Sequence, residues 1–364
     1  MKDEQTSEKE EPKLGKTLVD DFKRKDFFRT LKRELKELKE FFLTEARKKQ
    51  LQRMGRFRQA LYIFIWLFKK LFLSLSPTRR ILFFISLVLI FSYDQNNASD
   101  QNRLFASFLI LMFILLLELK DKFLARNELQ AGRTVQRALM PEPSPDVPGW
   151  SLWLFTKPAN EVGGDLVDFL PLGKERFGLT LGDIAGKGLG AALLMVKLQA
   201  TLRALAPDCN SLSELGSKLN EIFYRDSIPN RFASLIYLEL PVRKNEIRIL
   251  NAGHLPPLIL KKLQIEELAK GDAAIGLALK VKYHEHEIQI QKGDSLLIYS
   301  DGVIEAQNEQ GEFFGEQRLM DSLPAWVDLS PAEIGKRLLD SIDHFVGPAP
   351  STDDLSLIIV KKIS

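Results

Sequence analysis

Four short acidic turns in the second half of the sequence carry the residues best suited to chemistry. Each combines aspartate with glycine, polar neighbours or both, at 162–165 (with Asp168 three residues on), 182–188, 300–302 and 352–354. Carboxylates gathered from distant turns repel one another unless cations lie between them. Hard divalent ions take oxygen ligands, and neighbouring glycines let backbone carbonyls and water approach them. Together the turns indicate a divalent metal site, although a single Asp-Gly is usually only a turn.

Short β-like runs after Trp150 must position these turns. Patterns of apolar and β-branched residues predict strands at 151–156, 166–172, 176–184, 233–240, 246–251, 258–262, 286–290, 295–300 and 355–361. Helical spacing predicts helices at 189–205, 211–224, 316–325 and 331–345. Brief polar connections such as 242–245 favour antiparallel hairpins, and helices in two separate blocks favour an α+β fold around a β-sandwich.

Several motifs in this half carry a family resemblance. They are 136–141 (QRALMP), 162–169 (VGGDLVDF), 181–188 (LGDIAGKG) followed by 191–195 (AALLM), 251–257 (NAGHLPP), 298–306 (IYSDGVIEA) and 352–357 (TDDLSL). Residues 136–362 thereby resemble the bacterial branch of the metal-dependent PPM (type 2C, PP2C) protein serine/threonine phosphatases, the RsbU/SpoIIE family. The resemblance implies a PP2C-like β-sandwich flanked by helices.

The resemblance also implies a role for each acidic residue. Two Mn²⁺ or Mg²⁺ ions would be bound by Asp165, Asp183, Ile184 through its carbonyl, Asp301, Asp353 and Asp354. Asp183 would bridge the two ions, and Asp183 and Asp165 are the residues expected to be catalytic. Asp168, Gly164, Gly302 and His254 are expected to position the metal ligands without binding the ions themselves. Lys187, which stands where many relatives have histidine, is given no catalytic role.

The reaction implied is hydrolysis of phosphoserine or phosphothreonine by water activated between the two ions. The substrate implied is a phosphorylated regulatory protein, by resemblance a small anti-sigma-factor antagonist, and no nucleic-acid partner is expected. A cysteine nucleophile is not needed, and the single Cys209 excludes a disulfide framework within the chain. His254 could protonate the leaving oxygen, but a turn histidine that bonds to backbone is the commoner case.

Two other interpretations compete with this one. Residues 186–191 fit the dinucleotide-binding pattern G-x-G-x-x-A after a strand, but that fold needs repeated parallel β-α-β units. A Walker loop fails, because Gly188 follows Lys187 where Ser or Thr is required. The domain could also be a catalytically silent binding module that senses membrane signals, although such a module would not need its aspartates.

The first half of the chain is basic and contains two apolar runs. These runs, 81–93 and 104–119, flank a polar turn at 94–103, with arginines before the first run and lysines after the second. This asymmetry predicts a two-helix transmembrane hairpin with its outer flanks and the N-terminus in the cytoplasm, in a multi-pass protein of the cytoplasmic membrane. Both runs are shorter than the roughly 20 residues usually needed. The alternative is a hydrophobic hairpin packed against another protein.

The segments beside this hairpin suggest further contacts. The helix predicted at 26–47 has one apolar stripe, and the run 61–75, interrupted by Lys69 and Lys70, suits a helix lying on membrane lipid. In the helix predicted at 120–140, seven-residue spacing that begins at Leu117 permits a homodimeric coiled coil coupling the anchor to the phosphatase. The predicted organisation is 1–78 basic cytoplasmic or interfacial helices, 79–119 transmembrane hairpin, 120–148 linker helix and Pro-rich linker, and 149–364 PP2C-type phosphatase domain.

Overall fold

A computed structural model describes residues 51, 54–92, 100–226, 231–242 and 245–364. The chain divides into two compact units, Met1–Lys122 and Phe123–Ser364. The helix predicted at 26–47, most of the turn at 94–103 and part of the turn at 242–245 lie outside the described residues. The bounds of the four predicted segments remain predictions.

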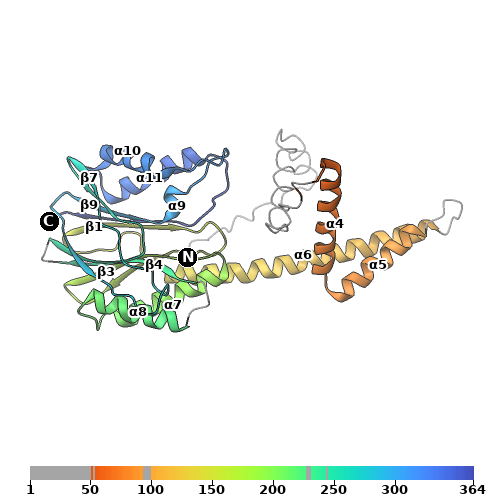
Figure 1. The fold of residues 1–364 in the computed structure, drawn as a ribbon, viewed down its shortest axis with the longest axis horizontal. Coiled ribbons are helices and arrows are strands. Elements are labelled where there is room, and N and C mark those ends of the chain that lie inside the picture. Colours follow the sequence, from red (N-terminus) through yellow and green to blue (C-terminus); the bar gives the residue numbers. More distant parts are fainter. Residues whose placement is uncertain (1–50, 52–53, 93–99, 227–230, 243–244) are drawn as a thin grey trace, which may run out of the picture. The chain divides into compact units, whose positions relative to one another are not determined.

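Two antiparallel five-stranded sheets form the second unit (Figure 1). One, the β1 sheet, has the order β1-β10-β9-β6-β7, and the other, the β2 sheet, has the order β2-β3-β4-β5-β8. All of their strand pairings are antiparallel. The strands are β1 (Trp150–Lys157), β2 (Leu166–Pro171), β3 (Arg176–Ile184), β4 (Ala233–Pro241), β5 (Glu246–Ala252), β6 (Leu258–Lys261), β7 (Gln264–Glu267), β8 (Glu285–Gln289), β9 (Ser295–Tyr299) and β10 (Leu355–Lys362).

Helices cover the outer face of each sheet (Figure 1). The β2 sheet packs against α7 (Leu189–Leu205) and α8 (Leu212–Asp226). The β1 sheet packs against α10 (Gly315–Ser322), the 3₁₀ helix η1 (Leu323–Trp326) and α11 (Pro331–Val346). The short α9 (Asp301–Ile304) follows β9. The predicted β-sandwich flanked by helices is therefore confirmed.

Burial on both faces explains why the central strands are almost continuously apolar. In β10, Ile358 and Val360 belong to the core between the sheets, whereas Leu357 and Ile359 pack under α11. Successive strand residues point to opposite faces, so each central strand contributes to two cores. Full burial of one such side chain contributes about 1.5–3 kcal/mol relative to exposure.

Among the residues of the first unit that the structure describes, three helices form: α4 (Arg56–Ser74), α5 (Pro77–Phe91) and α6 (Asp100–Leu139), which continues into the second unit. Helices α5 and α6 form an antiparallel hairpin. Arg79 forms ion pairs of 2.7 Å with Glu118 and 2.6 Å with Asp121, and further along the helices Ser86 Oγ lies 3.2 Å from Ser107 Oγ. The helical hairpin predicted within 79–119 is thus present.

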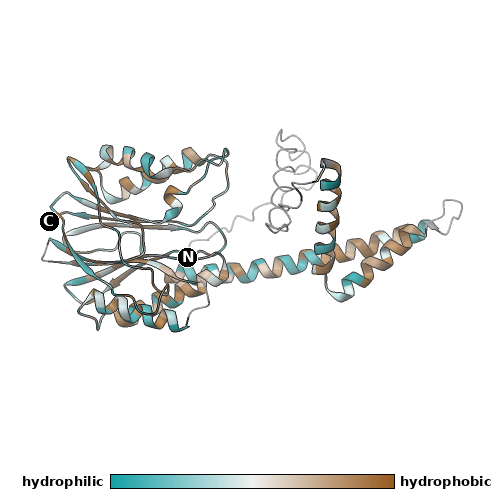
Figure 2. Ribbon diagram, in the orientation of Figure 1, coloured by the Kyte–Doolittle hydropathy of each residue, from teal (hydrophilic) through white to brown (hydrophobic). Residues whose placement is uncertain are grey.

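The spanning of a membrane by this hairpin is not supported. Within the described residues, no helix is both long enough and apolar enough to cross a bilayer. Helix α5 has 15 residues, short of the about 20 that a crossing needs. The apolar run of α6 lies between Arg103 and Glu118, and charged side chains are costly within a membrane. Figure 2 shows that apolar residues nevertheless dominate this part of α5 and α6.

The contact between α11 and β1 depends on Gly335. A methyl group at Gly335 would lie 2.0 Å from Cζ3 of Trp153, so the helix lies directly on the indole ring. We expect Gly335→Ala to lower the free energy of unfolding by about 1–3 kcal/mol, because overpacking outweighs the helix propensity of alanine. Circular dichroism melting of the purified chain measures this change.

Gly190→Ala in α7 is the matched control, since a methyl group there would meet nothing within 4 Å. Its melting temperature should equal or slightly exceed that of the wild type. Equal melting of Gly335→Ala and Gly190→Ala would contradict the close packing of α11 on Trp153.

Candidate active site

The strand register brings the acidic turns together in pairs. Leu166 pairs with Gly182 between β2 and β3, which places Asp165 beside Asp183 at the same end of the β2 sheet. In the β1 sheet, Leu357 pairs with Tyr299, so Asp301 after β9 lies near the residues that precede β10. The two sheets meet at this end, where Ser356 Oγ lies 2.5 Å from Asp165 Oδ2.

Asp165 is buried within this cluster, at 3 % exposure. Its pKa is raised well above the ordinary value, first by burial and then by the nearby charges of Asp183 and Asp354. Hydrogen bonding to Ser356 partly offsets this rise by stabilising the charged form. Ser356 Oγ also lies 2.9 Å from Thr156 Oγ1, so a hydroxyl network holds the Asp165 carboxylate in place.

The pKa of Asp183 depends on the carboxylates of the other acidic turns. Burial raises its pKa to about 7, with further contributions from Asp301, Asp353 and Asp354. The pKa of Asp301 is raised as well, by burial and then by Asp353. Asp165, Asp183, Asp301 and Asp353 therefore belong to one electrostatic cluster, in which neighbouring carboxylates help to raise the pKa values of Asp165, Asp183 and Asp301.

The donor chemistry of this cluster fits a hard divalent cation. Its side chains offer only oxygen ligands. A bound cation would relieve the repulsion between carboxylates that contributes to the raised pKa values of Asp165 and Asp183. The Ile184 carbonyl oxygen also faces the site, because a methyl group at Gly164 would lie 3.4 Å from it and 3.6 Å from Asp183 Oδ1. In the part of the chain that is described, no set of three or more His, Cys, Asp or Glu side chains already surrounds a common metal position.

Asp354 bonds chiefly to the backbone. Its Oδ1 accepts a hydrogen bond of 2.8 Å from the Ala159 N–H, and its Oδ2 accepts one of 2.6 Å from the Gly164 N–H. The neighbouring Asp353 is more open, with its side chain 33 % exposed. Of the two acids predicted in this turn, Asp353 is therefore the more exposed carboxylate, and Asp354 fastens the loop that carries Asp165.

Two cationic side chains at the site were not given roles from the sequence. The ammonium group of Lys187 lies 2.8 Å from Asp353 Oδ2 and also donates a hydrogen bond to the Thr352 carbonyl. The guanidinium group of Arg231 donates a hydrogen bond to the Ala185 carbonyl and fills the space beside Gly186. Both contacts join residues far apart in the chain, so no local sequence pattern predicts them.

Asp168 points away from the cluster. Its two carboxylate oxygens accept hydrogen bonds of 2.8 and 2.6 Å from Arg203, which ties β2 to α7 behind the site. Gly302 supports the site by its small size, because a methyl group there would lie 1.9 Å from the Asp354 carbonyl oxygen. Both positions agree with the support predicted for these residues, whose functional roles remain predictions.

His254 is buried between two partners. Its Nε2 lies 3.2 Å from the Tyr299 carbonyl and its Nδ1 lies 2.8 Å from Ser234 Oγ. A carbonyl only accepts, so Nε2 carries the proton and Nδ1 accepts from the serine. Burial lowers the pKa of His254 to about 4, which keeps the ring neutral near pH 7. These contacts favour a structural role for His254 over a role as the acid that protonates the leaving oxygen.

Gln136 holds the loop of Asp165 from the other side. Its Nε2 donates to the Gly163 carbonyl at 2.8 Å, and its Oε1 accepts from the Gly163 N–H at 3.2 Å. Three residues on, the Leu139 carbonyl accepts hydrogen bonds from Gln199 and Arg203 of α7. The end of α6 is therefore bonded directly to the segment that delivers a predicted metal ligand.

The dinucleotide-binding alternative is wrong. The glycine-rich segment 186–191 does lead into α7, but β3, which precedes it, pairs with β4 in the antiparallel sense. A dinucleotide fold needs a parallel crossover at this point.

Comparisons with known proteins agree with this geometry. Residues 173–362 match the family described as Stage II sporulation protein E (SpoIIE). The chain is 27% identical to Protein IcfG of Synechocystis sp. over 300 residues, which are 73% of this chain and 47% of IcfG. It is 23% identical to the phosphoserine phosphatase RsbU of Bacillus subtilis over 239 residues, or 65% of this chain and 70% of RsbU.

The fold also matches solved structures. The SiaA-PP2C domain of Pseudomonas aeruginosa superposes with a TM-score of 0.59 at 18% identity, covering 67% of this chain and 99% of that domain. The chain spans about half the length of IcfG, so the comparison with IcfG applies only to the part that the two proteins share. Since the family match covers more than half of the chain, the protein belongs to the SpoIIE family, and its second unit has a PP2C-like fold.

Proposed function

We propose that this protein is a metal-dependent serine/threonine phosphatase whose catalytic centre is the cluster of Asp165, Asp183, Asp301 and Asp353. The observation that carries the proposal is the rise in the pKa values of Asp165, Asp183 and Asp301, caused first by burial and then by neighbouring carboxylates, which marks a concentration of negative charge suited to divalent cations. When bound, two Mn²⁺ or Mg²⁺ ions would supply Lewis-acid activation of water and neutralise phosphoryl charge.

The residues divide this work according to their positions. The charges of Asp301, Asp353 and Asp354, which flank strands of the β1 sheet, help to raise the pKa of Asp183, and Asp183 also contacts Asp165. Asp183 therefore lies at the centre of the aspartate cluster and suits a bridging ligand. Asp301 and Asp353 face it from the other sheet, and the Ile184 carbonyl adds a neutral oxygen. Asp354 lies close enough to share in binding while it anchors the loop of Asp165.

The names of two relatives support a proposal for the substrate class. RsbU and RsbP of Bacillus subtilis are both named phosphoserine phosphatases. We propose that this protein likewise removes phosphate from serine or threonine of a small regulatory protein of the anti-sigma-factor-antagonist class.

Replacing Asp183 tests the catalytic centre. Asp183→Asn removes the central charge, and we expect kcat/KM on p-nitrophenyl phosphate and on a phosphoserine peptide to fall at least roughly a hundredfold. Calorimetry should show weaker Mn²⁺ binding by the same variant. Asp208→Asn, on an exposed loop outside the cluster, is the matched control. Undiminished hydrolysis by Asp183→Asn, or by the wild type in excess chelator, would contradict the proposal.

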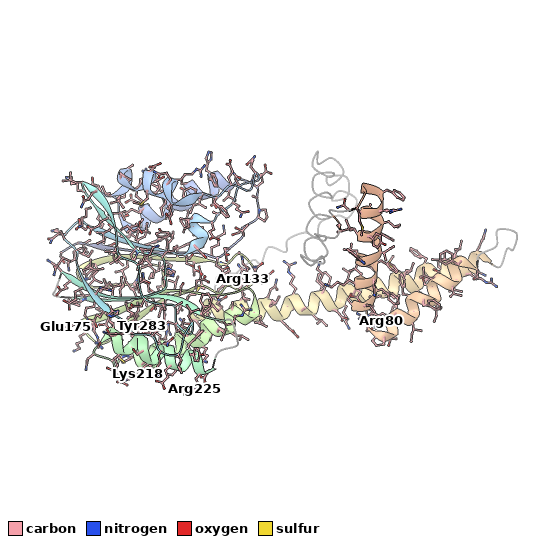
Figure 3. All side chains as sticks on the ribbon, in the orientation of Figure 1. Arg80, Arg133, Glu175, Lys218, Arg225 and Tyr283 are labelled. Atoms are coloured by element: carbon pink, nitrogen blue, oxygen red, sulfur yellow. The ribbon has the colours of Figure 1, made fainter. Side chains whose placement is uncertain are left out.

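We further propose that α6 regulates the site. Arg133 of this helix, labelled in Figure 3, pairs with Glu161 at 3.4 Å, and Gln136 holds Gly163 one turn later. On the same helix, Leu124, Ala131 and Ala138 are exposed, as a homodimeric coiled coil over 117–140 requires. A shift or pairing of α6 would then reach the loop of Asp165 through these bonds.

Gln136→Ala tests this coupling. The substitution leaves the N–H and carbonyl of Gly163 without their partners, and we expect kcat/KM to fall roughly tenfold as the Asp165 loop loosens. Gln130→Ala, exposed on the same helix, should behave as the wild type. The coupling is wrong if a fragment lacking residues 1–134 is monomeric and matches the activity of the full chain in lipid.

We also propose that the first unit attaches the protein to the cytoplasmic membrane, with the N-terminus and phosphatase domain in the cytoplasm. Large apolar side chains are exposed along its hairpin, among them Phe84 at 64 %, Phe105 at 63 % and Phe108 at 55 %. The basic residues around them suit anionic head groups.

Vesicle co-sedimentation measures this attachment. The full chain should pellet with anionic phospholipid vesicles, and Phe105→Glu should lower its partition coefficient roughly tenfold because it loses buried apolar area and adds charge. Phe313→Glu replaces a phenylalanine 52 % exposed in the phosphatase domain and serves as the control. A full chain that stays in the supernatant at low salt would overturn membrane attachment.

A further inference from the structure

A groove extends from the aspartate cluster across one face of the phosphatase domain. Its volume is about 510 Å³, and it begins at Asp183 and Asp301. Such a volume accommodates several side chains, well beyond a single phosphoryl group. The groove therefore has room for the part of a substrate that flanks the phosphorylated residue.

The walls of the groove are apolar for much of their length. Phe232, Leu255, Pro256 and Ile304 line it, and Phe232 keeps 37 % of its surface exposed. The other three side chains are partly buried, and partly exposed apolar residues gathered in a concave surface favour the binding of another molecule. The side chains come from separate turns of the fold, so the folded domain builds this surface.

Lys270 supplies the one positive charge among the residues that line the groove. Its backbone is held firmly, because the Asp272 N–H donates a 2.9 Å hydrogen bond to the Asn251 carbonyl and Gly271 lies against the same residue. The Asp272 carboxylate in turn bonds His284. In the described part of the chain, no carboxylate forms an ion pair with Lys270, which leaves its ammonium group available to a partner.

We propose that this groove docks the substrate polypeptide beside its phosphorylated serine, with an apolar side chain on the Phe232–Pro256–Ile304 wall and an acidic side chain on Lys270. The inference rests on the proposed phosphatase function and adds a sequence preference to it. Charge complementarity selects this occupant, since the aspartate end takes the phosphorylated residue through its cations and the opposite charge at Lys270 takes a carboxylate. Lys270 is a specificity residue and acts on no reacting atom.

The test compares phosphoserine peptides that differ in one position. A single glutamate, lysine or glutamine is moved through the positions flanking the phosphoserine, and the ratio of kcat/KM for glutamate to kcat/KM for lysine is measured with the full chain. At one position the wild type should prefer glutamate by roughly tenfold, and Lys270→Glu should invert the preference there. Raised salt should shrink the ratio.

Lys262→Glu is the matched control, because this lysine is exposed on the turn between β6 and β7 and does not line the groove. Its glutamate-to-lysine ratio should equal that of the wild type. A ratio that Lys270→Glu leaves unchanged, or that both variants alter alike, would overturn the docking groove.

The same assays distinguish failure of the docking groove from failure of the proposed phosphatase function. A wild-type chain that hydrolyses p-nitrophenyl phosphate but shows no charge preference at any peptide position refutes the groove alone. A wild-type chain with Mn²⁺ that hydrolyses neither compound refutes the phosphatase function and, with it, the inference.

Discussion

The geometry of the site depends on the carboxylate of Asp354. This residue precedes β10 in the β1 sheet, yet its oxygens accept hydrogen bonds from the N–H groups of Ala159 and Gly164, which precede β2 in the other sheet. It therefore fastens the two sheets together where the other aspartates meet. A buried N–H that loses such a partner costs about 1–3 kcal/mol, so the loop of Asp165 stays in place even though its neighbours repel it.

The same residue explains why two motif glycines are needed. A methyl group at Gly163 would lie 2.6 Å from Asp354 Oδ2, and one at Gly302 would lie 1.9 Å from the Asp354 carbonyl oxygen. Both distances are shorter than side-chain carbons adopt. From the sequence these glycines were expected to admit water and carbonyls to a metal. In the structure they let Asp354 lie between two turns, which is a packing requirement.

Local pattern predicted the elements of the second unit well, because doubly buried strands are apolar and short. It missed β7, whose four residues are mostly exposed and carry no alternation, and α9, because Asp301-Gly302 was taken as a turn. The aspartates themselves were found from their types and turns. Their partners were not, since the bond from Asp354 to Gly164 joins residues 190 positions apart. Hydropathy likewise found the apolar hairpin, although none of the described helices is both long and apolar enough to cross a bilayer.

The dipeptide Gly163-Gly164 connects α6 to the aspartate cluster. Gln136 at the end of α6 binds both polar groups of the Gly163 backbone, and Asp354 binds the N–H of Gly164. Asp165 follows immediately, so its carboxylate is located by a helix on one side and by the β1 sheet on the other. Any displacement of α6 must therefore either stretch the bonds to Gly163 or carry the loop with it. Because the proposed cation binding needs carboxylates from both sheets at once, we expect a small displacement at this dipeptide to change metal affinity.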